Sequence, residues 1–162
     1  MSIYCTLDRP DAGQGALSTG LLIGLAGGLA EILVVELYSA LAGGDVATVA
    51  RHVASAVGLD GASAVAGVAV HMGLAAALGI VLSAIVQSLG ALLARDRAIW
   101  AFMMGSLAAV WAINFFIVLP VVSPGFVHLL PYAITFASKL AFGVAAAAAL
   151  QLVRQGHVGT CR

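Results

Sequence analysis

Residues 17–41, LSTGLLIGLAGGLAEILVVELYSAL, place two glutamates inside an apolar stretch of membrane-spanning length. About 20 mostly apolar residues in a helix cross the hydrocarbon core of a bilayer. A charged group at the centre of such a helix costs about 2.5–3.5 kcal/mol on insertion scales, so it usually has a partner. Glu31 and Glu36 are therefore expected to meet polar groups supplied by other parts of the chain.

The composition of the whole chain indicates a membrane-embedded protein. The 162 residues are 62% hydrophobic and 9% charged, with a mean hydropathy of +1.11. An ordinary soluble domain has about 25% charged residues, so the lipid bilayer is the predicted surrounding of this chain. The formal net charge of zero gives no indication of a nucleic-acid partner.

Four stretches are long and apolar enough to span a membrane, and they cover residues 17–41, 62–94, 98–121 and 126–153. Lipid offers no partner to backbone polar groups, so these spans are predicted to be helices. Short turns at 95–97 and 123–125 predict that consecutive helices are antiparallel neighbours. The predicted fold class is an all-α integral membrane protein, a four-transmembrane-helix antiparallel bundle that forms a single membrane domain over residues 1–162.

A shorter helix is predicted at residues 45–57, DVATVARHVASAV, between the first two spans. Valines and alanines recur there at helical spacing, while Thr48, Arg51 and His52 occupy the other side. This pattern is typical of a short amphipathic helix that lies at the membrane interface. The alternative is a helical lid packed over the bundle.

Basic residues are distributed unequally between the two predicted sides of the membrane. One side has Arg9, Arg95, Arg97, Arg154 and Arg162, and the other has Arg51. Positive residues concentrate on the cytoplasmic side of membrane proteins. The sequence therefore predicts that both termini are cytoplasmic and that the 45–57 helix lies on the outer face.

The polar residues inside the spans fall at two predicted depths, counted at about 1.5 Å per helical residue. Glu31 and Lys139 lie near the midplane of the first and fourth spans, and a buried ion pair between them is the natural prediction. Glu36, His71 and Asn114 fall together in the outer half. The pair either fixes the register of two helices or takes part in the function, and the sequence leaves both hypotheses open.

Four polar residues of the last span share one predicted helix face. His128, Tyr132, Thr135 and Lys139 are spaced by four, three and four residues, which places them in a stripe. The stripe could conduct protons or hold a row of waters, or it could join two helices by polar contacts. Pro131 is expected to kink this helix.

Glycines of the first span predict a close helix–helix contact. Gly20, Gly24 and Gly28 recur at four-residue spacing, and such small residues let helix backbones approach each other in membranes. The pattern fits packing within the chain and also fits dimerisation.

Cofactor and enzyme signatures are weak in this chain. His71 and His128, on different spans, could ligate a b-type haem between helices, and this is the one cofactor hypothesis. The sequence has no metal-binding motif, nucleophile elbow, phosphate-binding loop or zincin motif. A non-enzymatic role is therefore favoured.

The segments GLAGGLAE and FFIVLPVVSPGFVHLLP resemble those of uncharacterised bacterial inner-membrane proteins of the YagU type. The resemblance covers most of the chain, although this chain is shorter and lacks the long polar segment expected between the first two spans. It implies a location in the bacterial inner (plasma) membrane and a link to acid tolerance. It implies no mechanism for Glu31 or Lys139.

The sequence thus leads to three functional hypotheses. The first is a non-enzymatic accessory subunit of a larger membrane complex, or a self-associating bundle, held together by its charges. The second is a small proton- or ion-coupled conductor or transporter that uses Glu31 and Lys139. The third is an electron carrier with haem at His71 and His128.

Overall fold

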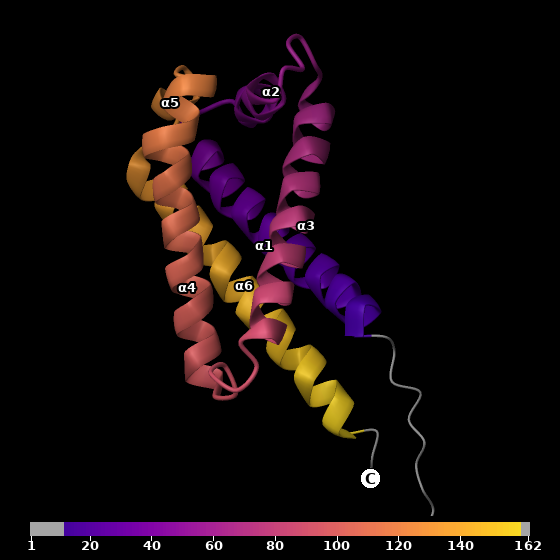
Figure 1. Ribbon diagram of the computed structural model, residues 1–162. Coiled ribbons are helices and arrows are strands. Elements are labelled where there is room, and N and C mark those ends of the chain that lie inside the picture. Colours follow the sequence, from indigo (N-terminus) through magenta and orange to yellow (C-terminus); the bar gives the residue numbers. More distant parts are fainter. Residues whose placement is uncertain (1–11, 160–162) are drawn as a thin grey trace, which may run out of the picture.

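The computed structural model describes residues 12–159, and all regular secondary structure in that part of the chain is helical (Figure 1). The elements are α1 (Ala12–Ala42), α2 (Val46–Ala56), α3 (Ala64–Ser88), α4 (Asp96–Ile113), the π-helix η1 (Asn114–Val118), α5 (Leu119–Val122), the 3-10 helix η2 (Phe126–His128) and α6 (Tyr132–Gly159). The all-α prediction is confirmed. Arg9 and Arg162, used above to predict orientation, lie outside the described residues.

Within the described residues, four helices are long and apolar enough to cross a membrane, as predicted. They cover Gly15–Ala42, Ala64–Ser88, Asp96–Val122 and Tyr132–Gln155. The second helix is shorter than the predicted 62–94. The Ser63 hydroxyl caps its start by accepting a hydrogen bond from the Ala66 N–H at 3.2 Å, and the helix ends at Ser88, before a turn in which the Leu92 N–H donates to the Leu89 carbonyl.

The last long helix begins later than the predicted residue 126. Pro131 lies immediately before its first residue, Tyr132, and the Pro131 carbonyl accepts hydrogen bonds from the Ile134 and Thr135 N–H groups. Proline lacks an N–H and disfavours helical conformation in the residue before it. The chain before Pro131 therefore forms the separate short helix η2, and the predicted kink is in fact a break.

The order of packing differs from the order of the chain. Helix α1 packs against both α3 and α6, and α4 packs against α6. The consecutive helices α3 and α4 do not pack extensively against each other, so the prediction that all consecutive spans are neighbours was wrong for this pair. Figure 1 shows α3 and α4 diverging from the turn that joins them, with α1 and α6 running obliquely to both.

Glycines account for the close contact of α1 with α3. A Cβ atom added at Gly20 or Gly24 would collide with the backbone of α3, at Ile80 and Ala75 respectively, and one added at Gly79 would collide with the backbone of α1. On the α6 side, the Phe142 ring lies against Gly27. The glycine stripe predicted from the sequence, which also includes Gly28 facing Ala75 and Met72, is thus occupied by packing within the chain.

The hydrophobic core lies in the half of the molecule that contains the α3–α4 turn. Its most completely buried large side chains are Ile23, Ile99, Met103, Leu107 and Phe142. They come from the first half of α1, the first two thirds of α4 and the middle of α6. This half is closely packed, and α2, α5 and the polar cluster lie in the opposite half.

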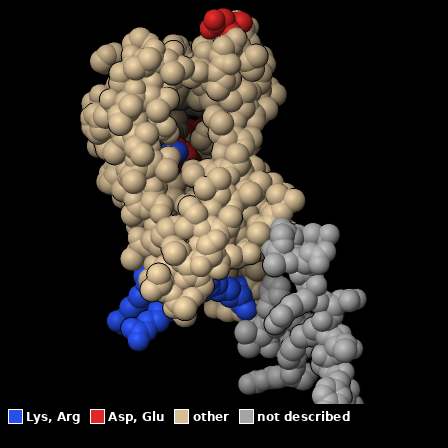
Figure 2. All heavy atoms as spheres, viewed as in Figure 1, with Lys and Arg blue, Asp and Glu red and all other residues tan. Residues whose placement is uncertain are grey.

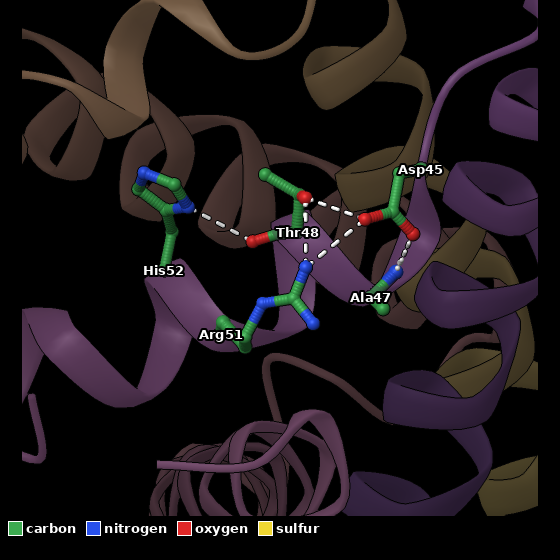
Figure 3. A network of polar contacts seen from close by, with 5 residues as sticks. All are labelled: Asp45, Ala47, Thr48, Arg51 and His52. Atoms are coloured by element: carbon green, nitrogen blue, oxygen red, sulfur yellow. Dashed lines mark hydrogen bonds and ion pairs between the residues drawn. The ribbon is translucent and has the colours of Figure 1, made fainter. Parts of the chain in front are cut away.

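Helix α2 packs onto α3 as a lid. Ala54 is fully buried, and a Cβ atom on Gly67 of α3 would collide with the Ala50 backbone. Asp45 caps the helix start: its carboxylate accepts hydrogen bonds from the Ala47 N–H at 2.9 Å and the Thr48 hydroxyl at 2.6 Å (Figure 3). The lid alternative of the sequence analysis therefore describes α2 better than a helix attached to the membrane surface alone.

Candidate functional site

Glu31 of α1 and Lys139 of α6 form the predicted ion pair. The Lys139 Nζ lies 2.8 Å from both Oε1 and Oε2 of Glu31. The prediction that this pair is buried was wrong, because the side chains retain 13% and 12% of their accessible surface. Among the described residues, no charged side chain is fully buried. The pair therefore lies at the wall of an open space and not inside a dry core.

His71 of α3 completes a three-helix cluster around this pair. Its Nε2 atom lies 3.9 Å from Glu31 Oε2, which is too long for a direct hydrogen bond. This nitrogen is shielded from solvent and has no hydrogen-bond partner among the described residues. The cluster thus contains a carboxylate that already has a partner and a ring nitrogen that lacks one.

A cavity of about 110 Å³ opens onto this cluster. Three sets of residues line it: Glu31, Ile32, Val35 and Glu36 of α1; Val49, Ala50 and Val53 of α2 with Gly67, Val68 and His71 of α3; and Phe115, Phe126, Leu130, Thr135 and Ser138 of the later part of the chain. Figure 2 shows the surface hollowed toward the α2 end of the molecule, with acidic and basic atoms visible inside the hollow. The walls are mainly apolar, and the polar groups gather on a few residues.

Both hydroxyl groups of this cavity already donate a hydrogen bond to a backbone carbonyl. Thr135 Oγ1 donates to the Tyr132 carbonyl at 3.0 Å, and Ser138 Oγ donates to the Thr135 carbonyl at 2.9 Å. Trp111 Nε1 donates to Thr135 Oγ1 at 3.1 Å. The remaining capacity of both hydroxyls is that of an acceptor.

Only part of the predicted stripe of the last span exists. Thr135 lines the cavity and Lys139 binds Glu31. Tyr132 is 45% exposed and packs in an aromatic cluster with Trp111, Phe115 and Phe116. His128 is exposed and lies in η2, outside α6. The prediction of one continuous face was wrong, because the break at Pro131 separates His128 from the other three residues.

The predicted outer level is also only partly assembled. Glu36 and His71 both line the cavity. Asn114 is half-buried at the start of the π-helix η1 and is not among the residues that line the cavity. Trp111 and Ser138 also belong to the site, and neither was predicted from the sequence. Trp111 meets its partner Thr135 across a helix pair, so no local spacing marked it.

The polar network on α2 is separate from the cavity cluster. The hydrogen bond from Thr48 is the main cause that holds the pKa of Asp45 below its ordinary value of 3.8. Desolvation is the second-largest cause and acts in the opposite direction. The Ala47 N–H and Arg51, whose Nη2 lies 3.0 Å from Asp45 Oδ2, lower the pKa further. On the same helix, His52 Nδ1 lies 2.9 Å from the Thr48 carbonyl. These contacts stabilise the lid at its outer edge (Figure 3).

Comparisons with family models, curated proteins and solved structures found no match to this chain. The resemblance to YagU-type proteins accordingly stays a prediction. Within the described part of the chain, no group of three or more histidine, cysteine, aspartate or glutamate side chains could hold a metal ion. The cavity and its charged cluster are therefore the features of this molecule that bear on its function.

Proposed function

We propose that this protein is a small polytopic membrane protein that carries protons across the membrane, with Glu31, Lys139 and His71 as its central groups. The observation that supports the proposal is the cavity that reaches Glu31, halfway along a helix apolar enough to cross a membrane. Ionisable groups at membrane depth are expensive and commonly mark proton or substrate pathways.

The three central groups have the chemistry that proton transfer requires. A carboxylate and an imidazole can both bind and release protons. The ion pair of Lys139 with Glu31 forms when the Glu31 carboxylate is charged and weakens when that carboxylate is protonated. The 3.9 Å separation of His71 Nε2 from Glu31 Oε2 is suited to a change of partner or to a shared water molecule. The ion pair then serves as the switch, since protonation of Glu31 would release Lys139.

A carrier fits the packing better than an open channel. On one side of the cluster is the cavity, and on the other side is the buried core that includes Phe142, with Lys139 Nζ 5.7 Å from the centre of its ring. A proton that reaches Glu31 from the cavity therefore needs a rearrangement of α1 against α6 to leave on the far side. Alternating access of this kind is typical of small-substrate carriers.

The proposed orientation places α2 outside and both termini in the cytoplasm of a bacterial cell, in the inner membrane. Basic atoms gather at the end of the molecule opposite α2 (Figure 2), where Arg95 and Arg97 flank the start of α4. This asymmetry supports the orientation through the preference of basic residues for the cytoplasmic side. The cavity would then face the outer side.

The other two hypotheses receive less support. An accessory bundle held together by its charges is expected to have a dry core around them, and the cavity beside Glu31 does not fit that expectation. Haem ligation needs His71 and His128 to face one space, and only His71 lines the cavity. We therefore place the accessory role second and keep the haem hypothesis as an untested prediction.

The test is proton flux into liposomes that contain the purified protein. We expect a flux with the wild type that is lost in Glu31→Gln and also in the charge-balanced double variant Glu31→Gln with Lys139→Met. Asp60→Asn, in the exposed loop between α2 and α3, is the matched acid-to-amide control and should keep the flux. Flux that persists in the double variant, or no flux in any protein, would contradict the proposal and favour the accessory role.

A further inference from the structure

We infer that the cavity beneath α2 binds a small organic ammonium ion, a protonated amine with a short apolar substituent. The inference rests on the proposed function in one respect, because it names the solute that would move with or against the proton. The binding site itself is argued from the walls of the cavity and can be tested without transport.

The free polar groups of the cavity are acceptors. The hydroxyl groups of Thr135 and Ser138 donate their hydrogen bonds to backbone carbonyls. The Nε2 atom of His71 has no hydrogen-bond partner among the described residues, and it is an acceptor in the neutral tautomer that carries its proton on Nδ1. The carboxylates of Glu31 and Glu36 are acceptors too. A ligand suited to these walls must donate hydrogen bonds.

The charges of the lining residues favour a ligand with a single positive charge. Lys139 neutralises Glu31 at 2.8 Å, and His71 is neutral in the acceptor form described above. Glu36 has no ion-pair partner in the described part of the chain, and Arg51, the basic residue of α2, is already paired with Asp45 at 3.0 Å. One monovalent cation beside Glu36 would therefore leave the lining neutral.

The apolar walls favour an organic cation over a metal ion. Phe115 and Phe126 both line the space, with ring centroids 6.4 Å apart, and aromatic faces attract ammonium groups. Val35, Val49 and Val53 offer contacts to an alkyl group. A hard metal ion needs about six or more oxygen ligands, and the described residues contain no cluster that could supply a metal site.

The size of the cavity restricts the ligand to a small one. About 110 Å³ holds several water molecules or a few heavy atoms, so a large aromatic cation would not fit inside it. Anions are disfavoured because Glu36 would repel them, and because Lys139 is already paired with both oxygens of Glu31. A primary amine with a short alkyl chain satisfies every one of these conditions.

The experiment measures binding of propylammonium to the purified full chain in detergent by calorimetry, in wild type and Glu36→Gln. The variant should fold, because Glu36 is exposed, and a thermal melt verifies this. We expect Glu36→Gln to weaken binding about tenfold or more, as is typical of a lost charge-assisted hydrogen bond. Asp60→Asn is the control for general loss of negative charge and should bind as the wild type does.

Probes of matched size sharpen the result. Tetramethylammonium has the charge without N–H donors, 1-propanol has a donor without the charge, and propionate has the opposite charge. Each should bind more weakly than propylammonium. Equal affinity of wild type and Glu36→Gln for propylammonium, or binding of any of the three other probes as tightly as propylammonium, would overturn the inference.

Failure of this inference and failure of the transport proposal are distinguishable. If propylammonium does not bind in a Glu36-dependent manner while proton flux still requires Glu31, the ammonium site is wrong and the proton carrier stands. If binding depends on Glu36 but no protein supports flux, the site stands and the carrier is wrong.

Discussion

The two halves of this molecule are built on opposite principles. In the half that contains the α3–α4 turn, glycines bring α1 against α3 and α6, and large side chains such as Ile23 and Phe142 are completely buried. In the half beneath α2, α3 and α4 diverge and leave a cavity beside a partly exposed ion pair. Close packing stabilises the fold in the first half, and this allows the second half to keep a cavity with a few polar groups on mainly apolar walls.

The comparison predicts that the largest losses of stability come from substitutions in the packed half. Gly79→Leu would drive a side chain into the α1 backbone at Gly20 and Gly24, where no flexible side chain can move aside. We expect a loss of about 3 kcal/mol or more in the free energy of unfolding, the upper range for overpacking. Thermal unfolding in detergent, or steric trapping in bicelles, measures the loss.

Gly73→Leu is the matched control for that substitution. It lies on the same helix, and a Cβ atom there would meet nothing within 4 Å. Its stability should equal or slightly exceed that of the wild type, because glycine is unfavourable within a helix. If both variants melt alike, the glycine contact does not stabilise the fold, and the contrast between the two halves fails.

An intermediate effect is expected where the two halves meet, at the ion pair. Glu31→Gln leaves the Lys139 cation without its partner among largely apolar neighbours, and we expect a loss of about 2–3 kcal/mol. Adding Lys139→Met removes the unpaired charge, so the double variant should be more stable than the Glu31→Gln single variant. Glu36→Gln, on the exposed part of the same helix, should change the unfolding free energy by less than about 0.5 kcal/mol.

The double-mutant cycle at Glu31 and Lys139 decides this prediction. A coupling energy clearly different from zero is the expected outcome, since the two groups are 2.8 Å apart. Additive effects of the two substitutions would mean that the contact contributes nothing to stability. The polar cluster could then change partners at little cost in free energy. The ion pair would then not mark the point where the packed half meets the hollow half.

The sequence predicted the elements of the packed half and the pair at the boundary. Hydrophobic runs of spanning length fix the depth of each residue along its own helix, so Glu31 and Lys139 could be matched from their positions alone. The glycines of α1 indicated a close contact for a similar reason, since small residues have one evident use on a helix face. These signals are local to a single helix.

The arrangement of the hollow half could not be predicted in this way. Which helices are neighbours depends on contacts such as Gly27 with Phe142, between residues far apart in the chain, and a short turn between α3 and α4 does not bring their full lengths together. The membership of Trp111 in the site depends on the same long-range packing. Pro131 was visible as a helix perturbation, but the sequence did not distinguish a kink from a break that removes His128 from α6.

The smallest expected effect lies at the edge of the hollow half, where Asp45 holds the lid. The contacts from Thr48, Ala47 and Arg51 lower the pKa of Asp45 below 3.8, so the folded state favours the carboxylate more strongly than the unfolded chain does. This contribution is fully present above the unfolded pKa and is lost as the pH falls through the lowered pKa of the folded state. Hydrogen-exchange protection of α2, corrected for intrinsic rates, should therefore fall in acid below about pH 3.8.

Asp45→Asn separates this charge effect from capping, because asparagine caps a helix about as well as aspartate. The variant should show slightly lower protection of α2 at neutral pH and little further change with acid, while the protection of α4 and α6 stays as in the wild type. Equal acid sensitivity in the variant would place the titrating group elsewhere. Loss of protection in α4 and α6 together with α2 would mean that the lid and the packed core unfold as one unit, and that the two halves are not independent.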